Sequence, residues 1–202
     1  MKKILVLLVV LFTAPAFAVS DDTKHIKAVE AYLTSITSIV ADFSQVAPDG
    51  GISTGKFFLQ RPGKMRWQYN PPTPILLVSN GKTLTYFDAE LDQVNYIPLD
   101  ETLAGFLAQK TIKLQSDATV LVDFKRSGGI VRASIVQKEQ PEQGTLTLEL
   151  TENPLQLKQM KIVDAAGGET SIQLQNAAFG SVINDKLFVF IDPRGAAPRK
   201  RR

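Results

Sequence analysis

The stretch that decides the fold runs from residue 55 to residue 99 and contains the segments GKFFLQRPGKMRWQY (55–69), ILLVSNGKTLTYFD (75–88) and DQVNYIPL (92–99). Aromatic and β-branched residues fill these segments, and Gly, Pro, Asn and Asp separate them, which is typical of short strands joined by turns. The segments contain few of the side chains that perform catalysis. Behind an export signal, this composition favours an apolar container over an enzyme.

The faces of these strands follow from alternation, because successive side chains point to opposite sides of a sheet. The pair Asn80-Gly81 predicts a tight hairpin, since both residues tolerate a positive φ. Alternation places the following side chains on one face of each of the first two strands: Phe57, Leu59 and Arg61, then Met65, Trp67 and Tyr69.

The later part of the chain also has the pattern of strands. Its segments are short, rich in Val, Ile, Leu, Thr and Phe, and separated by turn residues. With the strands already described, about ten strands are expected, which predicts one large antiparallel sheet or barrel. A sheet of this size must close or curl to avoid long unpaired edges, and a curled sheet has an inside. The later segments are residues 119–125, 130–138, 145–151, 155–163, 170–176 and 186–191.

Two helices are expected beside the sheet. A pair of aspartates precedes an amphipathic pattern in which β-branched residues from Thr34 onward weaken the helix, so we expect a change to strand at residues 41–45. A second, shorter helix is expected at residues 101–109, capped by Asp100. Each helix can be a permanent part of the core or a movable lid. The apolar face of the first pattern consists of Ile26, Val29, Leu33, Ile36, Val40 and Phe43.

The first eighteen residues have the pattern of an export signal. Two lysines precede an apolar run at residues 4–12, and the sequence Ala-Phe-Ala at residues 16–18 is accepted by signal peptidases, so we expect cleavage after Ala18. The apolar run is too short to remain as a membrane span. The chain has no cysteine, which excludes a disulfide and a lipid attached to cysteine.

The mature chain is expected to form one domain, residues 19–195, followed by a basic tail at residues 196–202. The formal net charge is +3, but five basic residues lie within positions 194–202 and the rest of the mature chain is net negative. The basic character therefore belongs to the tail, which argues against a nucleic-acid partner.

Few side chains are suited to catalysis or metal binding. His25 is the only histidine, so neither a His-rich zinc site nor a cysteine nucleophile is available. Asp88 and Asp92 lie in a predicted turn and are expected to be solvated, although a carboxylate pair of the glycosidase kind stays open at this stage.

Five groups of residues carry a resemblance to a known family: ADFSQ (41–45), GKFFLQRPGKMRW (55–67), LVSNGKTL (77–84), YFD with DQV (86–88 and 92–94), and FVF with PRG (188–190 and 193–195). In this order they resemble the periplasmic outer-membrane lipoprotein carrier family, LolA. The match covers essentially the whole mature chain and departs at the end, where a basic tail soon follows. The resemblance implies an α+β fold, an unclosed antiparallel β-barrel of about 10–11 strands with a helical lid over an apolar cavity.

The resemblance also implies a function. Members of the family accept acylated lipoproteins from an inner-membrane ATP-driven transporter and carry them through the periplasm to an outer-membrane acceptor. We therefore expect a monomeric carrier that is not an enzyme and uses no cofactor or metal. Because each methylene is worth about 0.8 kcal/mol, exposing an acyl chain of about 15 carbons to water costs on the order of 10 kcal/mol.

Site residues follow from the same resemblance. Arg61 is expected to latch the lid through carbonyl oxygens at the end of a lid helix, and the alternative is a rim arginine paired with a carboxylate. The candidates for acyl-chain binding are Phe57, Leu59, Met65, Trp67, Tyr69, Leu84 and Tyr86. The candidates for the underside of the lid are Ile26, Val29, Leu33, Ile36, Phe106 and Leu107.

Two other interpretations stay open. An exported β-sheet protein with a filled interior would bind a protein partner along its sheet edge and carry no lipid. A hydrolase would need His25, a serine and an aspartate to converge in a cleft, without the Gly-x-Ser-x-Gly turn that usually presents the serine. The volume of the interior and the position of His25 separate these interpretations from a carrier.

Overall fold

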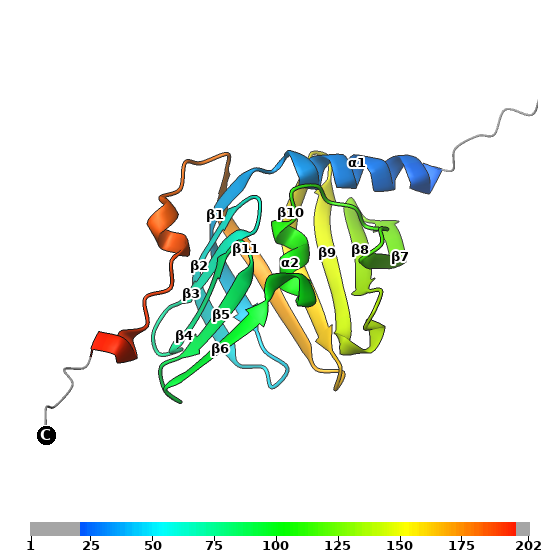
Figure 1. Ribbon diagram of the computed structural model, residues 1–202. Coiled ribbons are helices and arrows are strands. Elements are labelled where there is room, and N and C mark those ends of the chain that lie inside the picture. Colours follow the sequence, from blue (N-terminus) through cyan, green and yellow to red (C-terminus); the bar gives the residue numbers. More distant parts are fainter. Residues whose placement is uncertain (1–20, 197–202) are drawn as a thin grey trace, which may run out of the picture.

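The computed structural model describes residues 21–196, which form one curled β-sheet with two α-helices (Figure 1). Helix α1 spans Asp21–Ser35 and α2 spans Leu103–Ala108. The predicted export signal and residues 197–202 of the predicted tail lie outside the described residues. The strands are β1 (Ser38–Val46), β2 (Ile52–Gln60), β3 (Lys64–Tyr69), β4 (Ile75–Asn80), β5 (Thr83–Asp88), β6 (Gln93–Pro98), β7 (Thr119–Ser127), β8 (Ile130–Gln137), β9 (Gly144–Glu152), β10 (Leu155–Asp164) and β11 (Glu169–Phe179).

The strands form a single antiparallel sheet in the order β6-β5-β4-β3-β2-β1-β11-β10-β9-β8-β7. The chain runs through β1–β6 as a first meander, crosses over, and returns through β7–β11 as a second meander that pairs β11 with β1. Strands β6 and β7 are consecutive in the chain but form the two edges of the sheet. Their connection, residues 99–118, carries α2 across the gap. The described residues thus form an unclosed barrel of eleven strands, which confirms the predicted fold class.

The helices cover different parts of this barrel. Helix α1 lies across the end of the sheet at the top of Figure 1, and α2 lies over the inner face between the two meanders. The sheet curls partly through β-bulges: the register of β1 against β11 shifts between Val40 and Asp42, and that of β10 against β9 shifts between Leu157 and Gln159. A bulge bends its strand and increases the twist, and so helps the sheet to enclose an interior.

Alternation fills the inner face with apolar side chains. Ile39, Leu59 and Met65 are cross-strand neighbours on β1, β2 and β3, and each is at most 2% exposed. Ala133 and Leu148 are cross-strand neighbours on β8 and β9, and both are 0% exposed. Burying one large aliphatic side chain contributes about 1.5–3 kcal/mol, so these rows stabilise the curled form of the sheet.

Helix α1 ends earlier than predicted. It stops at Ser35 and β1 begins at Ser38, before the predicted change to strand at residues 41–45. The β-branched residues that follow Thr34 lose rotamer freedom in a helix and pack well in a sheet, and β1 gains two strand partners. Ile36, which we predicted on the underside of a lid helix, therefore lies in the connection between α1 and β1.

Helix α2 is also shorter than predicted, and its cap is a different residue. Thr102 Oγ1 accepts a hydrogen bond from the backbone N of Gly105 at 3.0 Å, so Thr102 caps α2 instead of Asp100. Asp100 belongs to the preceding 3₁₀ turn, Leu99–Glu101. This turn moves the start of α2 two residues beyond the predicted start at residue 101.

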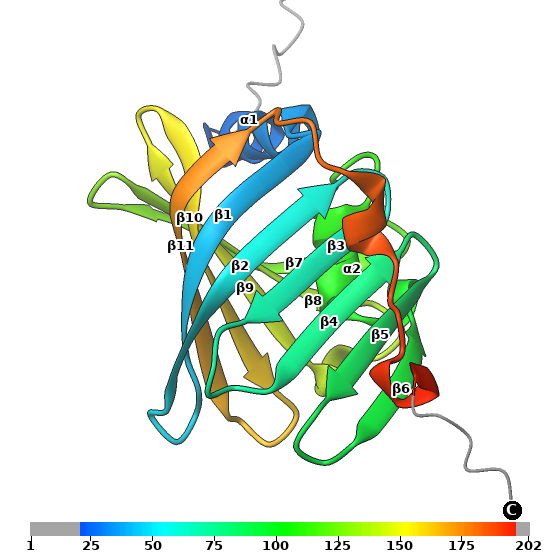
Figure 2. The same ribbon diagram turned by 90° about the vertical axis from the view of Figure 1, so that its left-hand side faces the viewer.

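The predicted strand at residues 186–191 is wrong. Residues 181–196 instead form a strap that crosses the outer face of the first meander and contains a 3₁₀ helix, Asp185–Phe188 (Figure 2). Phe188 is 2% exposed, and the ring of Phe190 lies 5.7 Å from that of Phe87. The outer face of this meander has apolar side chains, so the aromatic residues of the segment gain more by packing across it than by extending an edge.

The close approach of β2 and β3 at Gly55 generates a stability prediction. A Cβ atom at Gly55 would lie 2.2 Å from the carbonyl oxygen of Gln68 and 2.7 Å from the ring of Phe43. Gly55→Ala should therefore lower the free energy of unfolding by about 1–3 kcal/mol in urea titration. Strand propensity alone predicts the opposite sign, a gain of about 0.5–1 kcal/mol.

The matched control is Gly195→Ala, because a Cβ atom at Gly195 meets nothing within 4 Å. This variant should unfold at the same urea concentration as the wild type. A Gly55→Ala protein as stable as the control would contradict the close packing described for β2.

Candidate functional site

A cavity of about 190 Å³ lies between α2 and the inner face of the sheet. Both meanders contribute to its wall and α2 covers it, so the cavity lies between the two halves of the sheet. Its lining is mainly apolar, which is typical of sites for apolar ligands. The lining residues are Gln45, Met65, Trp67, Tyr69, Leu77, Leu103, Ala104, Leu107, Leu146, Met160, Ile162, Thr170 and Ile172.

The wall from the first meander is aromatic. Trp67 stacks on Phe57 with ring centroids 4.0 Å apart, and Phe43 packs edge-on at 5.0 Å against both Trp67 and Tyr69. Such pairs add about 0.5–1.5 kcal/mol beyond burial, which holds this wall in shape. The opposite wall is aliphatic and includes Met160, whose unbranched side chain adapts to ligands of variable shape.

The residues that we predicted for acyl-chain binding share the inner face but fall into two groups. The first group lines the cavity: Met65, Trp67 and Tyr69. The second group lies outside the lining, with three side chains buried in the core and the last half-buried on β5: Phe57, Leu59, Leu84 and Tyr86.

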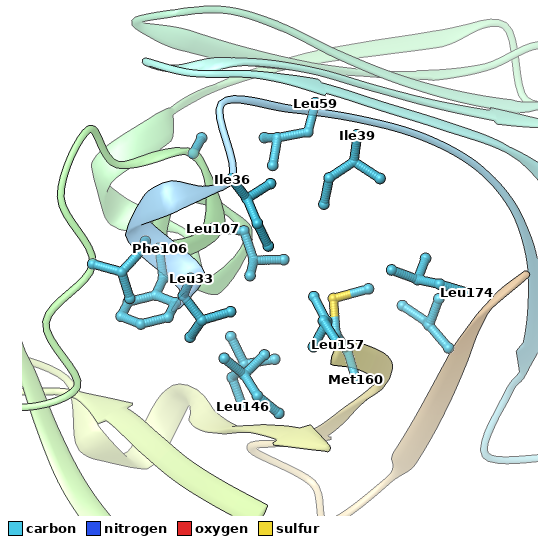
Figure 3. Close-up of a cluster of buried hydrophobic side chains, with 14 of the residues drawn as sticks. Leu33, Ile36, Ile39, Leu59, Phe106, Leu107, Leu146, Leu157, Met160 and Leu174 are labelled. Atoms are coloured by element: carbon cyan, nitrogen blue, oxygen red, sulfur yellow. The ribbon is translucent and has the colours of Figure 1, made fainter. Parts of the chain in front are cut away.

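The residues predicted for the underside of the lid are also divided. Leu107 of α2 lines the cavity, and Phe106 beside it is buried. Figure 3 shows Leu33 and Leu107 among the side chains of both meanders. Helix α2, and not α1, therefore covers the cavity. The four predicted residues of α1 and its connection pack in the core and do not line the cavity: Ile26, Val29, Leu33 and Ile36.

Arg61 follows the end of β2 and contacts both helices. Its Nη1 donates to the carbonyl oxygens of Leu33 and Ile36, the latter at 2.9 Å, and its Nε donates to that of Leu107 at 2.8 Å. The last carbonyls of a helix have no partner within the helix, and a guanidinium has enough donors for several of them. One side chain thus joins the ends of α1 and α2 to the end of β2.

The Arg61 cation is held by carbonyl oxygens. Burial lowers the pKa of Arg61 to about 10, so the group stays charged at neutral pH. Within residues 21–196, no carboxylate forms an ion pair with it. The turn that follows adds one more link to α2, because the backbone N of Gly63 donates to the carbonyl of Ala108 at 2.7 Å. Gly63 has a φ of +79°, which glycine adopts without strain.

Two polar side chains fasten α1 to the segment that follows α2. Glu30 is 8% exposed, and its Oε1 accepts a hydrogen bond from the backbone N of Leu114 at 2.9 Å. Thr34 Oγ1 accepts one from the backbone N of Ile112 at 3.0 Å. Displacing residues 99–118 therefore breaks contacts with α1 as well as with Arg61.

Other contacts hold α1 on the sheet and occupy His25. The Tyr32 hydroxyl accepts a hydrogen bond from the backbone N of Leu157, at the β10 bulge, at 3.0 Å. His25 Nε2 lies 3.8 Å from Glu152 Oε1, away from the cavity lining.

Asp88 Oδ1 accepts hydrogen bonds from two backbone N–H groups of its own turn. Within the described part of the chain, no group of three metal-ligating side chains occurs and no helix is long and apolar enough to cross a membrane.

One end of the cavity is polar. Tyr69 donates its hydroxyl hydrogen to Gln45 Oε1 at 2.7 Å, and Thr170 of β11 lines the cavity with them. All three side chains are half-buried. Burial raises the pKa of Tyr69 to about 12.

Sequence reasoning missed the whole contribution of the second meander to the lining, together with two residues of the first meander and two of α2. Alternation groups Leu146 with other inner residues of β9, and Met160 with Ile162 of β10, so the sequence carried part of the signal. It did not say which face is the inner one, because a shift of one residue exchanges the two faces. The missed residues are Gln45, Leu77, Leu103, Ala104, Leu146, Met160, Ile162, Thr170 and Ile172.

Comparison with known proteins adds an independent finding. Residues 34–191 match a family model described as outer membrane lipoprotein carrier protein LolA. An outer-membrane lipoprotein carrier protein of Azotobacter vinelandii is 30% identical over 202 residues, covering 93% of this chain and 95% of that protein. An uncharacterized protein of Rickettsia prowazekii is 27% identical over 202 residues, covering 100% of this chain and 93% of that protein.

Among solved structures, a LolA superfamily protein from Nitrosomonas europaea has a TM-score of 0.45 to this chain at 10% sequence identity. The superposition covers 82% of this chain and 97% of that one.

The raised pKa of Tyr69 predicts an alkaline loss of stability. A pKa near 12 in the folded state, against about 10 in the unfolded chain, means that the neutral phenol stabilises the fold below pH 10. This contribution should disappear as the pH rises from about 10 to 12. The free energy of unfolding of Tyr69→Phe should fall less steeply over this range than that of the wild type, as measured by urea titration at several pH values.

Tyr96→Phe is the matched control, because Tyr96 is 63% exposed and does not line the cavity. It should retain the wild-type slope between pH 10 and pH 12. Equal slopes for all three proteins would contradict the burial described for Tyr69.

Proposed function

The chain belongs to the LolA family of outer-membrane lipoprotein carrier proteins, and from this membership we propose that it binds the acyl chains of lipoproteins released from the inner membrane and delivers them to the outer membrane. The predicted export signal places it in the periplasm, where it acts without catalysing a reaction. Its partners are acylated lipoproteins, an inner-membrane ATP-driven transporter that loads it and an outer-membrane acceptor that unloads it.

The apolar cavity under α2 is the observation that carries this proposal. It lies on the inner face of an unclosed sheet, and its cover is part of the crossover that joins the two sheet edges. An acyl chain placed there leaves water at a gain of about 0.8 kcal/mol per methylene. The adaptable wall around Met160 suits chains of differing length.

The size of the cavity indicates that loading requires a movement. A cavity of about 150 Å³ accepts a molecule the size of benzene, and pockets for larger ligands have about 300–1,000 Å³. At about 190 Å³ the cavity accepts part of one acyl chain. Displacing α2 from the inner face would open the interior further, at the cost of its contacts with Arg61 and with the segment joined to α1.

Arg61 sets the balance between the empty and the loaded state. Its hydrogen bonds to carbonyls of both helices stabilise the closed form, and a hydrogen bond to a charged group contributes about 1.5–3 kcal/mol. An acyl chain that opens the lid breaks some of these bonds, which offsets part of its burial energy. The offset lets the carrier release cargo whose burial alone is worth on the order of 10 kcal/mol.

A protein-binding module with a filled interior is the rival function. The modest volume of the cavity favours it, because an interior that never opens could not hold a whole acyl chain. The two functions differ in what a larger side chain at the cavity does. In a carrier, a bulky residue on α2 excludes cargo, whereas in a module it only fills a gap in the core.

The first test of the proposed function is binding. The chain that starts after Ala18 should form a soluble complex with an acylated lipoprotein, detected by size-exclusion chromatography, and none with the same lipoprotein made without acyl groups. Ala104→Phe should bind at least tenfold more weakly while its thermal midpoint stays the same or rises, because Ala104 lines the cavity. Ala28→Phe, on the exposed side of α1, is the control.

Failure of the wild type to retain acylated lipoprotein presented in a releasable form would overturn the carrier function. Unchanged binding by Ala104→Phe would place the cargo elsewhere on the protein.

The second test concerns Arg61. Arg61→Leu should fold and load cargo but transfer it to acceptor membranes more slowly than the wild type, by about tenfold or more, because opening then breaks fewer hydrogen bonds and less of the burial energy of the cargo is offset. The rate is measured as the appearance of labelled lipoprotein in the membrane fraction. Arg66→Leu removes an arginine that contacts the strap, through the carbonyl of Leu187 at 3.1 Å, and should transfer normally. Normal transfer by Arg61→Leu would remove the latch and leave the carrier function standing.

A further inference from the structure

We propose that Gln45, Tyr69 and Thr170 form a polar mouth that holds the carbonyl group through which an acyl chain is attached to its cargo. This inference rests on the proposed function and adds the part of the ligand that the mouth recognises: the ester or amide carbonyl at the head of the chain.

The orientation of the Gln45 amide is the first observation. Its Oε1 is occupied by the Tyr69 hydroxyl at 2.7 Å, which leaves the Nε2 group as the donor that faces other partners. Among residues 21–196, Gln45 Nε2 donates no hydrogen bond, and no buried side-chain nitrogen or oxygen lacks a partner. The Gln45 Nε2 group is therefore accessible at the cavity, and the hydrogen bond from Tyr69 to Oε1 fixes the orientation of the amide.

The inner side chains become more exposed with distance from α1, and this change indicates where the mouth lies. Near α1 the inner side chains are closely packed, and Leu33, Leu59 and Leu148 are 0% exposed. At the other end of β1 the side chains of Gln45 and Thr170 are half-buried. The cavity therefore communicates with solvent at the end of the barrel opposite α1, and its polar groups lie there.

Thr170 completes the polar group from the second meander. It lines the cavity two residues before Ile172, and Ile172 pairs with Gln45 across β11 and β1. Within the described residues, the Thr170 hydroxyl forms no hydrogen bond with another side chain or with the backbone. Gln45 of the first meander and Thr170 of the second thus lie at the same end of the cavity, on two neighbouring strands.

The chemistry of the mouth matches the head of an acyl group. An acyl chain has a long apolar tail and one carbonyl oxygen, which accepts hydrogen bonds and donates none. With the tail under α2, the carbonyl would lie at the Gln45 amide, where a neutral hydrogen bond forms at the edge of water. An alkyl chain attached through an ether has a similar shape but lacks the carbonyl acceptor.

The test compares two lipids that differ only in this carbonyl: dioctanoylglycerol, a diester, and the dioctyl ether of glycerol. Binding is followed by the fluorescence of Trp67, the only tryptophan of the chain and part of the cavity wall. The wild type should bind the diester about fivefold more tightly than the diether. Gln45→Leu should lose most of this preference, because it removes the amide donor that faces the carbonyl. Gln173→Leu, on an exposed position of β11, is the matched control and should keep the preference.

The outcomes separate this inference from the proposed function. Equal binding of both lipids by the wild type would overturn the polar mouth and leave the carrier standing, and so would a Gln45→Leu protein that keeps the preference for the diester. Binding of neither lipid would count against the carrier and the mouth together. If Gln45→Leu does not fold, Thr170→Val tests the same preference, which it should reduce.

Discussion

The contacts of the Arg61 guanidinium join the ends of both helices to the sheet. A single half-buried cation, which directly follows the end of β2, donates to carbonyls at the ends of α1 and α2. A buried charge keeps its position only where enough acceptors surround it, so the two helix ends and the strand end specify each other's positions. Removing either helix end from this contact leaves the cation partly unpaired.

The sheet imposes the second constraint. Eleven strands in one curled sheet enclose more interior than two short helices fill, and the structure divides this space unequally. Side chains of α1 pack the end near Leu33, whereas α2 only covers the cavity beside Trp67 and Met160. Stability thus comes mainly from the packed end, and adaptability from the covered one, within a single fold.

Much of the fold could be predicted from local patterns. Alternation in residues 55–99 and the Asn80-Gly81 turn predict the strands of the first meander. The expected role of Arg61 came from the family resemblance, and its several donors suit free helix carbonyls. The end of α1, the cap at Thr102 and the strap at residues 181–196 could not be predicted, because each depends on tertiary pairing that outweighs local propensity. The cavity lining from β9–β11 needed knowledge of which strand face is the inner one.

The crossover of residues 99–118 has one more consequence. It is attached to the last strand of one meander and the first strand of the other, so α2 is connected to both free edges of the sheet. In the proposed carrier, an outward movement of α2 would pull on both of these edges. Uncovering the interior would then also widen it, so that the width of the barrel would follow the size of the cargo.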